Sequence, residues 1–149
     1  MKRDATTAFS FLYPARLRRS GGRVLVSFRD LPEALTEGDT RRDALAEAED
    51  SLEEAVAGRI RRGDPVPPPS PPVTDEVIVA LPTRMAFKAT VVIAFDCADV
   101  TRTRLAARLR CSEREVDRLL DPRHRSELSH LQQALAAIGK RFSVEMHAA

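Results

Sequence analysis

Arginines concentrated between residues 102 and 125 are the side chains best suited to chemistry in this sequence. A guanidinium group binds a DNA phosphate as a permanent cation, and it can also grip guanine through two donors. Arg102 and Arg104 begin one short helical pattern, where they would reach the DNA backbone. Arg114 and Arg118 lie on the next helical pattern, where they would reach bases. Arg123-His124-Arg125 follow in an expected loop that suits phosphate contact.

The segment that carries these arginines has the pattern of a helix-turn-helix. Ser112 is placed to cap the second helix, and Glu115 follows three residues later, as in a capping box. Arg110 falls where such turns usually carry glycine, so we expect a mildly strained or differently shaped turn. The rest of the pattern comprises Thr101 as the first cap, Leu105, Ala106 and Leu109 on the first helix, and Val116 and Leu119 on the second.

A further helix is expected after Ser126, and Gly139 closes it. The three helices would bury one small core and present the second helix of the pair to the major groove. The alternative is a small helical domain with a solvated arginine face, but the caps, the turn and the following helix together favour DNA binding. The third helix would direct inward Leu128, Leu131, Leu135 and Ile138. The residues expected at the DNA are Arg102, Arg104, Ser112, Glu113, Arg114, Asp117, Arg118, Arg123, His124 and Arg125.

Catalysis and metal binding find little support in the residue pattern. Metal-dependent nuclease chemistry needs carboxylates clustered on strands, whereas only Asp30 and Glu76 occur, isolated at strand ends. Cys97 and Cys111 lie far apart and share no ligand spacing with the histidines, so we expect both to be packing residues rather than a disulfide. No phosphate loop, nucleophile elbow or zinc motif is present. We therefore expect no enzyme activity, no metal and no cofactor.

A second charged surface is expected on a helix that begins after Gly38, capped by Asp39 or Thr40. The net charge is only +2, but residues 43 to 54 are dominated by Asp and Glu, far from the arginines. Separated signs suggest two surfaces with two different partners. The buried face of this helix would carry Leu45, Ala48, Leu52, Val56 and Ile60, and its acidic face Asp43, Glu47, Asp50 and Glu54.

The residues before this helix are typical of a β-hairpin. Residues 9–17 alternate between apolar and mostly polar side chains, which is the period of a half-buried strand. Pro14 lacks an N–H donor, so we expect this strand to lie at a sheet edge or to end near Pro14. A turn at residues 20–22 leads into a second strand over residues 24–28, and residues 30–34 are expected to form a loop.

Residues 64–72 are rich in proline and should be extended and stiff. Such runs sometimes bind SH3-like modules, but a spacer leading back to the sheet is favoured here. Residues 76–81 then form a third strand that Pro82 stops. The sequence predicts an α+β protein, with antiparallel strands and one helix in residues 1–82 and an all-helical domain in residues 83–149. Residues 141–146 are a candidate last strand, which either pairs between subunits or closes its own domain.

Composition places the 149-residue chain among globular proteins, because 43% of its residues are hydrophobic and 31% are charged. No apolar stretch is long enough to cross a membrane. The start of the chain, Met1-Lys2-Arg3-Asp4, leads into polar residues without the apolar core of a signal peptide. We therefore expect a cytoplasmic protein.

Both halves together resemble the HicB antitoxin family. Asp30-Leu31-Pro32 and Gly38-Asp39-Thr40 match its N-terminal pattern, whereas Arg29 and Glu33 depart from the family's Phe-Pro-Asp-Leu-Pro-Gly. Leu105-Ala106 and residues 116–126 and 134–141 resemble the Cro-like helix-turn-helix fused to many HicB proteins. The resemblance implies a partial RNase H-like N-terminal layer that binds HicA, a small basic ribonuclease that cleaves messenger RNA. It also implies binding to the operator of its own operon as a dimer or larger assembly.

The acidic helix fits this implication, because a basic nuclease should be attracted by Glu47, Asp50 and Glu54. The plain alternative is a solvated helix face, which most acidic helix faces are. A second functional class also stays open: a stand-alone transcription regulator whose N-terminal domain dimerises or senses something else. A third is a chain whose helix-turn-helix no longer binds DNA.

Overall fold

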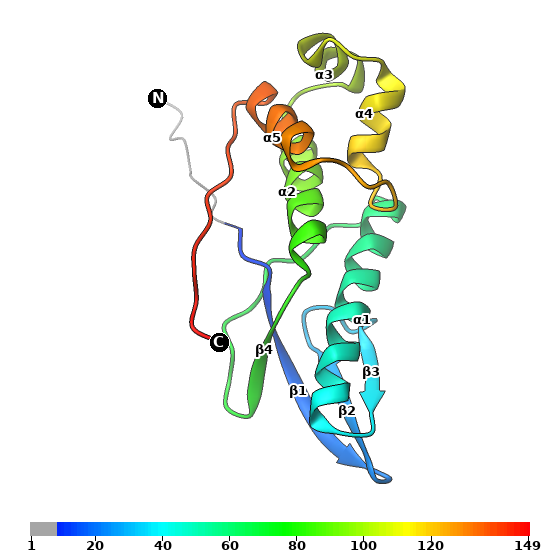
Figure 1. The fold of residues 1–149 in the computed structure, drawn as a ribbon, viewed down its shortest axis with the longest axis vertical. Helices are drawn as coiled ribbons and strands as arrows, with labels where there is room; N and C mark the ends of the chain where they lie inside the picture. Colours follow the sequence, from blue (N-terminus) through cyan, green and yellow to red (C-terminus); the bar gives the residue numbers. More distant parts are fainter. Residues whose placement is uncertain (1–8) are drawn as a thin grey trace.

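The computed structural model describes residues 9–149, so the expectation about Met1–Asp4 lies outside the described part. An antiparallel four-stranded sheet in the order β3-β2-β1-β4 is followed by a helical region, which confirms the α+β prediction. Figure 1 shows the sheet with α1 at one end of an elongated molecule, α3, α4 and α5 at the other, and α2 between. The strands are β1 (Leu12–Ser20), β2 (Arg23–Phe28), β3 (Leu35–Gly38) and β4 (Glu76–Ala80). The helices are α1 (Arg41–Arg62), α2 (Thr83–Cys97), α3 (Arg102–Leu109), α4 (Glu113–Leu120) and α5 (Leu128–Ala137).

The expected hairpin is present, with β1 and β2 joined by a two-residue turn. Gly21 and Gly22 have φ values of 59° and 79°, which glycine adopts without steric cost. Two consecutive positive φ values give a turn whose twist matches that of the strands, so Ser20 pairs directly with Arg23.

The expectation that Pro14 places β1 at a sheet edge is wrong, because β1 pairs with both β2 and β4. The Phe11 carbonyl accepts a bond of 2.9 Å from the Leu81 N–H on the β4 side. Backbone groups alternate along an antiparallel strand, so the nitrogen of Pro14 faces the β2 side. Pairing with β2 starts only at Ala15, opposite Phe28. Pro14 therefore lies just outside the part of β1 that pairs with β2, where no backbone N–H is needed.

Strand β3 was not expected from the sequence and pairs with β2 at the sheet edge. It has only four residues, and its single large apolar side chain, Leu35, is 63% exposed. The segment therefore lacks the alternation of apolar and polar residues by which a strand is recognised. It ends at Gly38, which lies against the first turn of α1. A Cβ at Gly38 would lie 2.3 Å from the Ala44 nitrogen, so only glycine fits.

Helix α1 begins and ends as expected. The Thr40 hydroxyl accepts from the Asp43 N–H at 3.1 Å, and Gly63 closes the helix with φ 73°. Its buried face packs across the sheet and contains more small residues than expected. Leu45 and Ile60 are only partly buried, and the fully packed positions are Ala44, Ala48, Leu52, Ala55, Val56, Ala57 and Gly58.

The proline-rich segment is a spacer that returns the chain to β4, as expected. Asp30 accepts hydrogen bonds from the Ser70 N–H at 2.8 Å and hydroxyl at 2.6 Å. Arg29 pairs with Glu76 at 2.8 Å and donates to a backbone carbonyl of the spacer. Buried Tyr13 donates its hydroxyl to the Pro67 carbonyl at 2.8 Å. The two carboxylates at the strand ends therefore tie down the spacer.

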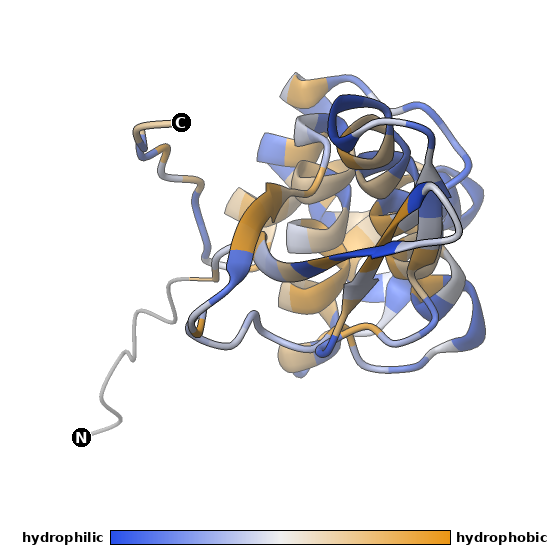
Figure 2. Cartoon of the chain, turned by 90° about the horizontal axis from the view of Figure 1, so that it is seen from below, coloured by the Kyte–Doolittle hydropathy of each residue, from blue (hydrophilic) through white to orange (hydrophobic). Residues whose placement is uncertain are grey.

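Two hydrophobic clusters fill the described part of the chain, and α2 contributes to both. Met85 and Ala89 belong to the cluster between sheet and α1, whereas Val91 and Phe95 belong to the cluster formed with α3, α4 and α5. Figure 2 shows apolar stretches in both the strands and the helices, which supply the residues of these two clusters. In residues 9–149, no helix combines the length and apolar character that a membrane span requires.

Three expectations for the C-terminal half are wrong. Leu128 is 46% exposed because it is the first residue of α5, at the end of the face that buries Leu131 and Leu135. Cys97 lies exposed at the end of α2, whereas Cys111 packs against the helical cluster as expected. Residues 140–149 form neither helix nor strand, so the candidate last strand at residues 141–146 is not formed within the single chain, although Phe142 packs against Phe87.

Candidate nucleic-acid interface and acidic helix face

The helix-turn-helix has the expected caps and turn. The Thr101 hydroxyl accepts from the Arg104 N–H at 3.2 Å. Ser112 and Glu115 form the predicted capping box, and these hydrogen bonds hold the pKa of Glu115 below its usual range. Arg110 has φ 55° and ψ 45°, so the left-handed backbone that was expected to favour glycine is present with arginine. Helix α4 therefore has a fixed start directly after a tight turn.

Side-chain contacts brace α3 against α4. Arg102 pairs with Asp117 at 2.9 Å and lies over the Phe95 ring, with 5.6 Å from its guanidinium carbon to the ring centroid. The Thr103 hydroxyl donates to Glu113 at 2.8 Å. Three residues expected at the DNA, namely Arg102, Glu113 and Asp117, are therefore engaged inside the protein. Ser112 is likewise engaged, in the cap of α4.

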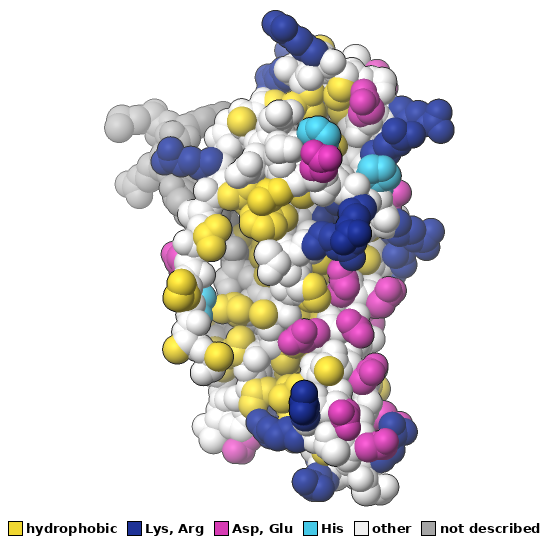
Figure 3. Space-filling model, in the orientation of Figure 1, with side chains coloured by type: hydrophobic (Ala, Val, Ile, Leu, Met, Phe, Trp, Pro, Cys, Tyr) yellow, Lys and Arg dark blue, Asp and Glu magenta, His cyan; other side chains and the backbone are white. Residues whose placement is uncertain are grey.

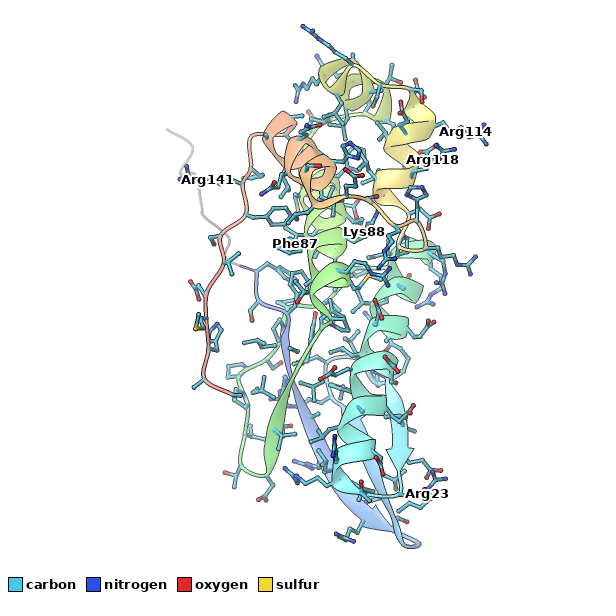
Figure 4. All side chains as sticks on the ribbon, viewed as in Figure 1. Arg23, Phe87, Lys88, Arg114, Arg118 and Arg141 are labelled. Atoms are coloured by element: carbon cyan, nitrogen blue, oxygen red, sulfur yellow. The ribbon has the colours of Figure 1, made fainter. Side chains whose placement is uncertain are left out.

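Arg114 and Arg118 have a different setting from these braced side chains. Both are exposed, and within residues 9–149 neither side chain forms an ion pair or hydrogen bond. Figure 4 shows both extending away from α4 into solvent. Val116, between them, is fully buried and anchors the helix in the core. Arg104 is also exposed, at the start of α3. Arg114, Arg118 and Arg104 are therefore available to a partner.

Lys88 holds the far end of α4, and the sequence reasoning missed it. Its ammonium donates to the carbonyls of Arg118 and Leu119 at 3.1 and 3.0 Å and to the Ser126 hydroxyl at 2.6 Å. Lys88 is only 4% exposed, and burial lowers its pKa to about 8. The two carbonyls are free acceptors at the end of α4, which a cation stabilises. The available signal was a lone lysine within the apolar pattern of α2 (Figure 4).

The loop between α4 and α5 carries the remaining expected DNA contacts. Arg123, His124 and Arg125 are all exposed. His124 and Arg125 line a cavity of about 410 Å³ between α4 and α5. Arg118 of α4 and His130 of α5 also line it. Arg123 lines a second cavity of about 430 Å³ between α1, α2 and this loop, together with Glu53, Glu54, Arg61 and Arg84. The proximity of Arg61 and Arg84 to Arg123 was not predictable, because the three arginines come from α1, α2 and the loop after α4.

The acidic face of α1 is exposed, as expected, at Glu47, Asp50 and Glu54. Figure 3 shows acidic side chains along α1 and basic side chains gathered beyond its end, over the helical region. Glu54 lines the same cavity as Arg123, so the two charged surfaces meet there. In the described residues, no group of three or more His, Cys, Asp or Glu side chains is arranged to hold a metal ion.

Comparison with known proteins gives a consistent result. Residues 12–90 match the family described as HicB-like antitoxin of bacterial toxin-antitoxin system. The chain belongs to the HicB antitoxin family. This membership confirms the family resemblance seen in the sequence, and it agrees with the expectation that the chain is not an enzyme.

Named relatives extend the match beyond the N-terminal half. Antitoxin HicB of Escherichia coli K12 is 33% identical over 135 residues, covering 90% of this chain and 98% of the relative. Antitoxin HicB 1 of Photorhabdus laumondii is 35% identical over 136 residues, covering 90% and 86%. Antitoxin HicB of Pseudomonas fluorescens Pf0-1 is 30% identical over 141 residues, covering 93% and 96%. The similarity therefore includes the helix-turn-helix.

Proposed function

We propose that this HicB protein neutralises a small HicA-like ribonuclease toxin in the cytoplasm and represses its own operon by binding operator DNA. The proposal of operator binding rests on a difference between the charged side chains of α4. Its other charged side chains are engaged internally, whereas Arg114 and Arg118 are exposed and unpaired within the described residues. A rigid helix with two available guanidinium groups suits reading of base edges in the major groove. Arg104, Arg123, His124 and Arg125 would contact phosphates on either side.

The toxin would bind the acidic face of α1 through Glu47, Asp50 and Glu54. A ribonuclease that holds RNA phosphates presents positive charge, and the exposed carboxylates of α1 complement that charge. Family membership supports this assignment over a merely solvated face, because the matched residues 12–90 include the whole of α1.

The two activities would belong to two domains, residues 1–82 and 83–149. Separate hydrophobic clusters support this division, although α2 contributes to both. We further propose a homodimer or tetramer, because two copies of α4 related by a twofold axis suit a palindromic operator.

The decisive experiment is co-purification with the product of the adjacent small reading frame, followed by a promoter-DNA shift with and without that product. Arg114→Ala and Arg118→Ala should each weaken promoter binding by roughly 5- to 150-fold, from about 1–3 kcal/mol per base contact, and leave toxin neutralisation intact. Glu47→Ala and Asp50→Ala should have the opposite pattern. Glu54 is less suitable because it lines the cavity shared with Arg123.

Arg19→Ala is the matched control, since Arg19 is an exposed arginine near the hairpin end of β1 and belongs to neither proposed surface. It should change neither activity. Equal losses of both activities from every variant, with folding preserved, would contradict two separate surfaces. Promoter binding without any small partner would instead favour a stand-alone regulator.

A further inference from the structure

Three arginines line the cavity of about 430 Å³ that lies where α1, α2 and the loop after α4 meet. Each comes from a different element: Arg61 from the last turn of α1, Arg84 from the first turn of α2 and Arg123 from the loop. Figure 3 shows basic side chains gathered beyond the acidic side chains of α1. Like charges that the fold brings together repel one another, so such a cluster attracts an anionic partner.

Carboxylates of the chain neutralise this cluster only in part. Arg84 pairs with Glu53, but the nitrogen and oxygen are 3.7 Å apart, which is longer than a hydrogen bond. Within the described residues, the guanidinium groups of Arg61 and Arg123 form no ion pair or hydrogen bond. Glu54 is the second acidic residue in the wall, which thus holds three cations and two anions. One positive charge is therefore left for an external anion.

The cavity adjoins the surface proposed to bind the operator. The two residues after Arg123 in the loop line the neighbouring cavity, together with Arg118 of α4. Lys88 lies one turn along α2 from Arg84, and its ammonium is bonded to carbonyls at the end of α4 (Figure 4). These bonds hold the start of α2 close to the end of α4. Basic groups therefore continue from α4 through the loop to the ends of α1 and α2.

We propose that Arg61, Arg84 and Arg123 together bind one phosphate of the operator backbone, beside the bases that α4 reads. A phosphodiester carries a single negative charge, which balances the excess charge of the cavity wall. Guanidinium donors form a fixed fork that suits phosphate oxygens. The inference rests on the proposed operator binding and extends it across the domain boundary, because Arg61 belongs to the domain proposed to bind the toxin.

The salt dependence of promoter binding by the full chain tests this contact. Arg61→Gln combined with Arg84→Gln should lower the slope of log affinity against log salt concentration by about 0.9, the contribution of one phosphate. Over the range from about 1 M to 0.1 M salt, this slope amounts to roughly eightfold weaker binding at 0.1 M. Thermal unfolding of the variant should be unchanged, since both side chains are exposed.

Arg42→Gln combined with Arg62→Gln is the matched control. It also removes two positive charges, from exposed arginines of α1 that do not line the cavity. Arg62 is paired with Asp64 at 2.7 Å, whereas its neighbour Arg61 is not paired within the described residues. Because exposed charges away from the DNA are screened by salt, promoter affinity should stay within about twofold of the wild type.

Phosphate-ethylation interference tests the contact in the wild-type chain itself. Ethylation of one promoter phosphate should weaken binding of the wild type and no longer affect the Arg61→Gln, Arg84→Gln protein. An unchanged slope and the same ethylation pattern in this variant would overturn the inference and leave operator binding intact. A wild-type chain that does not bind its promoter would instead refute the proposed function, and the inference with it.

A free phosphate compound is the other source of such an anion, and inorganic pyrophosphate is the probe for it. Calorimetric titration of the DNA-free chain with pyrophosphate would be compared between the wild type and the Arg61→Gln, Arg84→Gln variant. Pyrophosphate binding that is lost in the variant, with promoter affinity unchanged, would overturn the DNA contact and assign the cavity to a free anion.

Discussion

Replacing Lys88 with methionine removes the cation that joins α2 to the end of α4. Methionine keeps much of the lysine's length and apolar contact, but it cannot donate to the carbonyls of Arg118 and Leu119. The Ser126 hydroxyl also loses its donor, although a hydroxyl can rotate toward another partner. The substitution therefore isolates the hydrogen bonding of Lys88 from its packing.

The expected cost follows from these three contacts. Leaving a buried acceptor unpaired costs about 1–3 kcal/mol, and two carbonyls are affected directly. Removing the buried ammonium recovers part of its desolvation free energy, which opposes that loss. We expect Lys88→Met to lower the free energy of unfolding by about 2–4 kcal/mol. Promoter affinity should also fall, because the position of α4 relative to α2 is no longer fixed.

Urea unfolding at several pH values provides the assay. Burial lowers the pKa of Lys88 to about 8, below its value of 10.5 in the unfolded chain. Between pH 8 and 10.5 the unfolded chain therefore binds more protons, so the contribution of Lys88 makes the free energy of unfolding rise with pH. Lys88→Met should lack this contribution. Exposed Lys140→Met is the control and should change stability by less than about 0.5 kcal/mol. A Lys88→Met protein as stable as the wild type would refute the reasoning.

Four further substitutions, one of them a control, test local features of the fold by denaturant unfolding. Gly38→Ala should destabilise by about 3 kcal/mol or more because its Cβ would meet the Ala44 backbone. Gly58→Ala is the control and should be neutral or stabilising, because its Cβ would meet only the flexible side chains of Arg61 and Arg62. Equal effects of the two substitutions would contradict this. Ser112→Ala should cost about 1 kcal/mol through loss of the α4 cap, and no loss would exclude a stabilising capping box. Arg110→Gly should stabilise by up to about 1 kcal/mol by relieving the left-handed backbone, and destabilisation would contradict strain there.

The sequence predicted the features that depend on local chemistry. The caps at Thr40 and Ser112 and the turn glycines at residues 21 and 22 were found in their expected roles. Each of these depends on a residue type whose hydrogen bonding or backbone preference acts within a few positions of itself. The helical spacing of apolar residues likewise predicted α1 and α4, because a long or strongly amphipathic pattern indicates a helix reliably.

Features that depend on distant partners were not predictable. Strand β3 forms because β2 has a free edge, and nothing in its four residues signals this. Pro14 was misplaced because the sequence could not show where pairing with β2 begins. The engagement of Arg102 with Asp117 is similar, since the residues are 15 positions apart and meet only when α3 packs on α4. The sequence therefore identified the charged surface but not which of its charges are available.

That distinction yields a prediction about Asp117, which the sequence placed at the DNA. Its carboxylate pairs with Arg102, and their side chains are 61% and 56% exposed. An ion pair this exposed contributes about 0–1 kcal/mol, so Asp117→Asn should scarcely affect stability. The change removes a negative charge close to the DNA phosphates and frees Arg102, so promoter affinity should rise, opposite to the effect of Arg118→Ala.

A gel shift at two salt concentrations would measure this, with Asp96→Asn, an exposed carboxylate on α2, as the control. A gain that shrinks at high salt would show that Asp117 acts through charge. A loss of affinity confined to particular operator bases would mean instead that Asp117 accepts a hydrogen bond from cytosine. Asp117 would then be a reading residue, and its pairing with Arg102 would describe only the DNA-free chain. The sign of the affinity change thus decides whether α4 recognises DNA through its two available arginines or through its acidic residues as well.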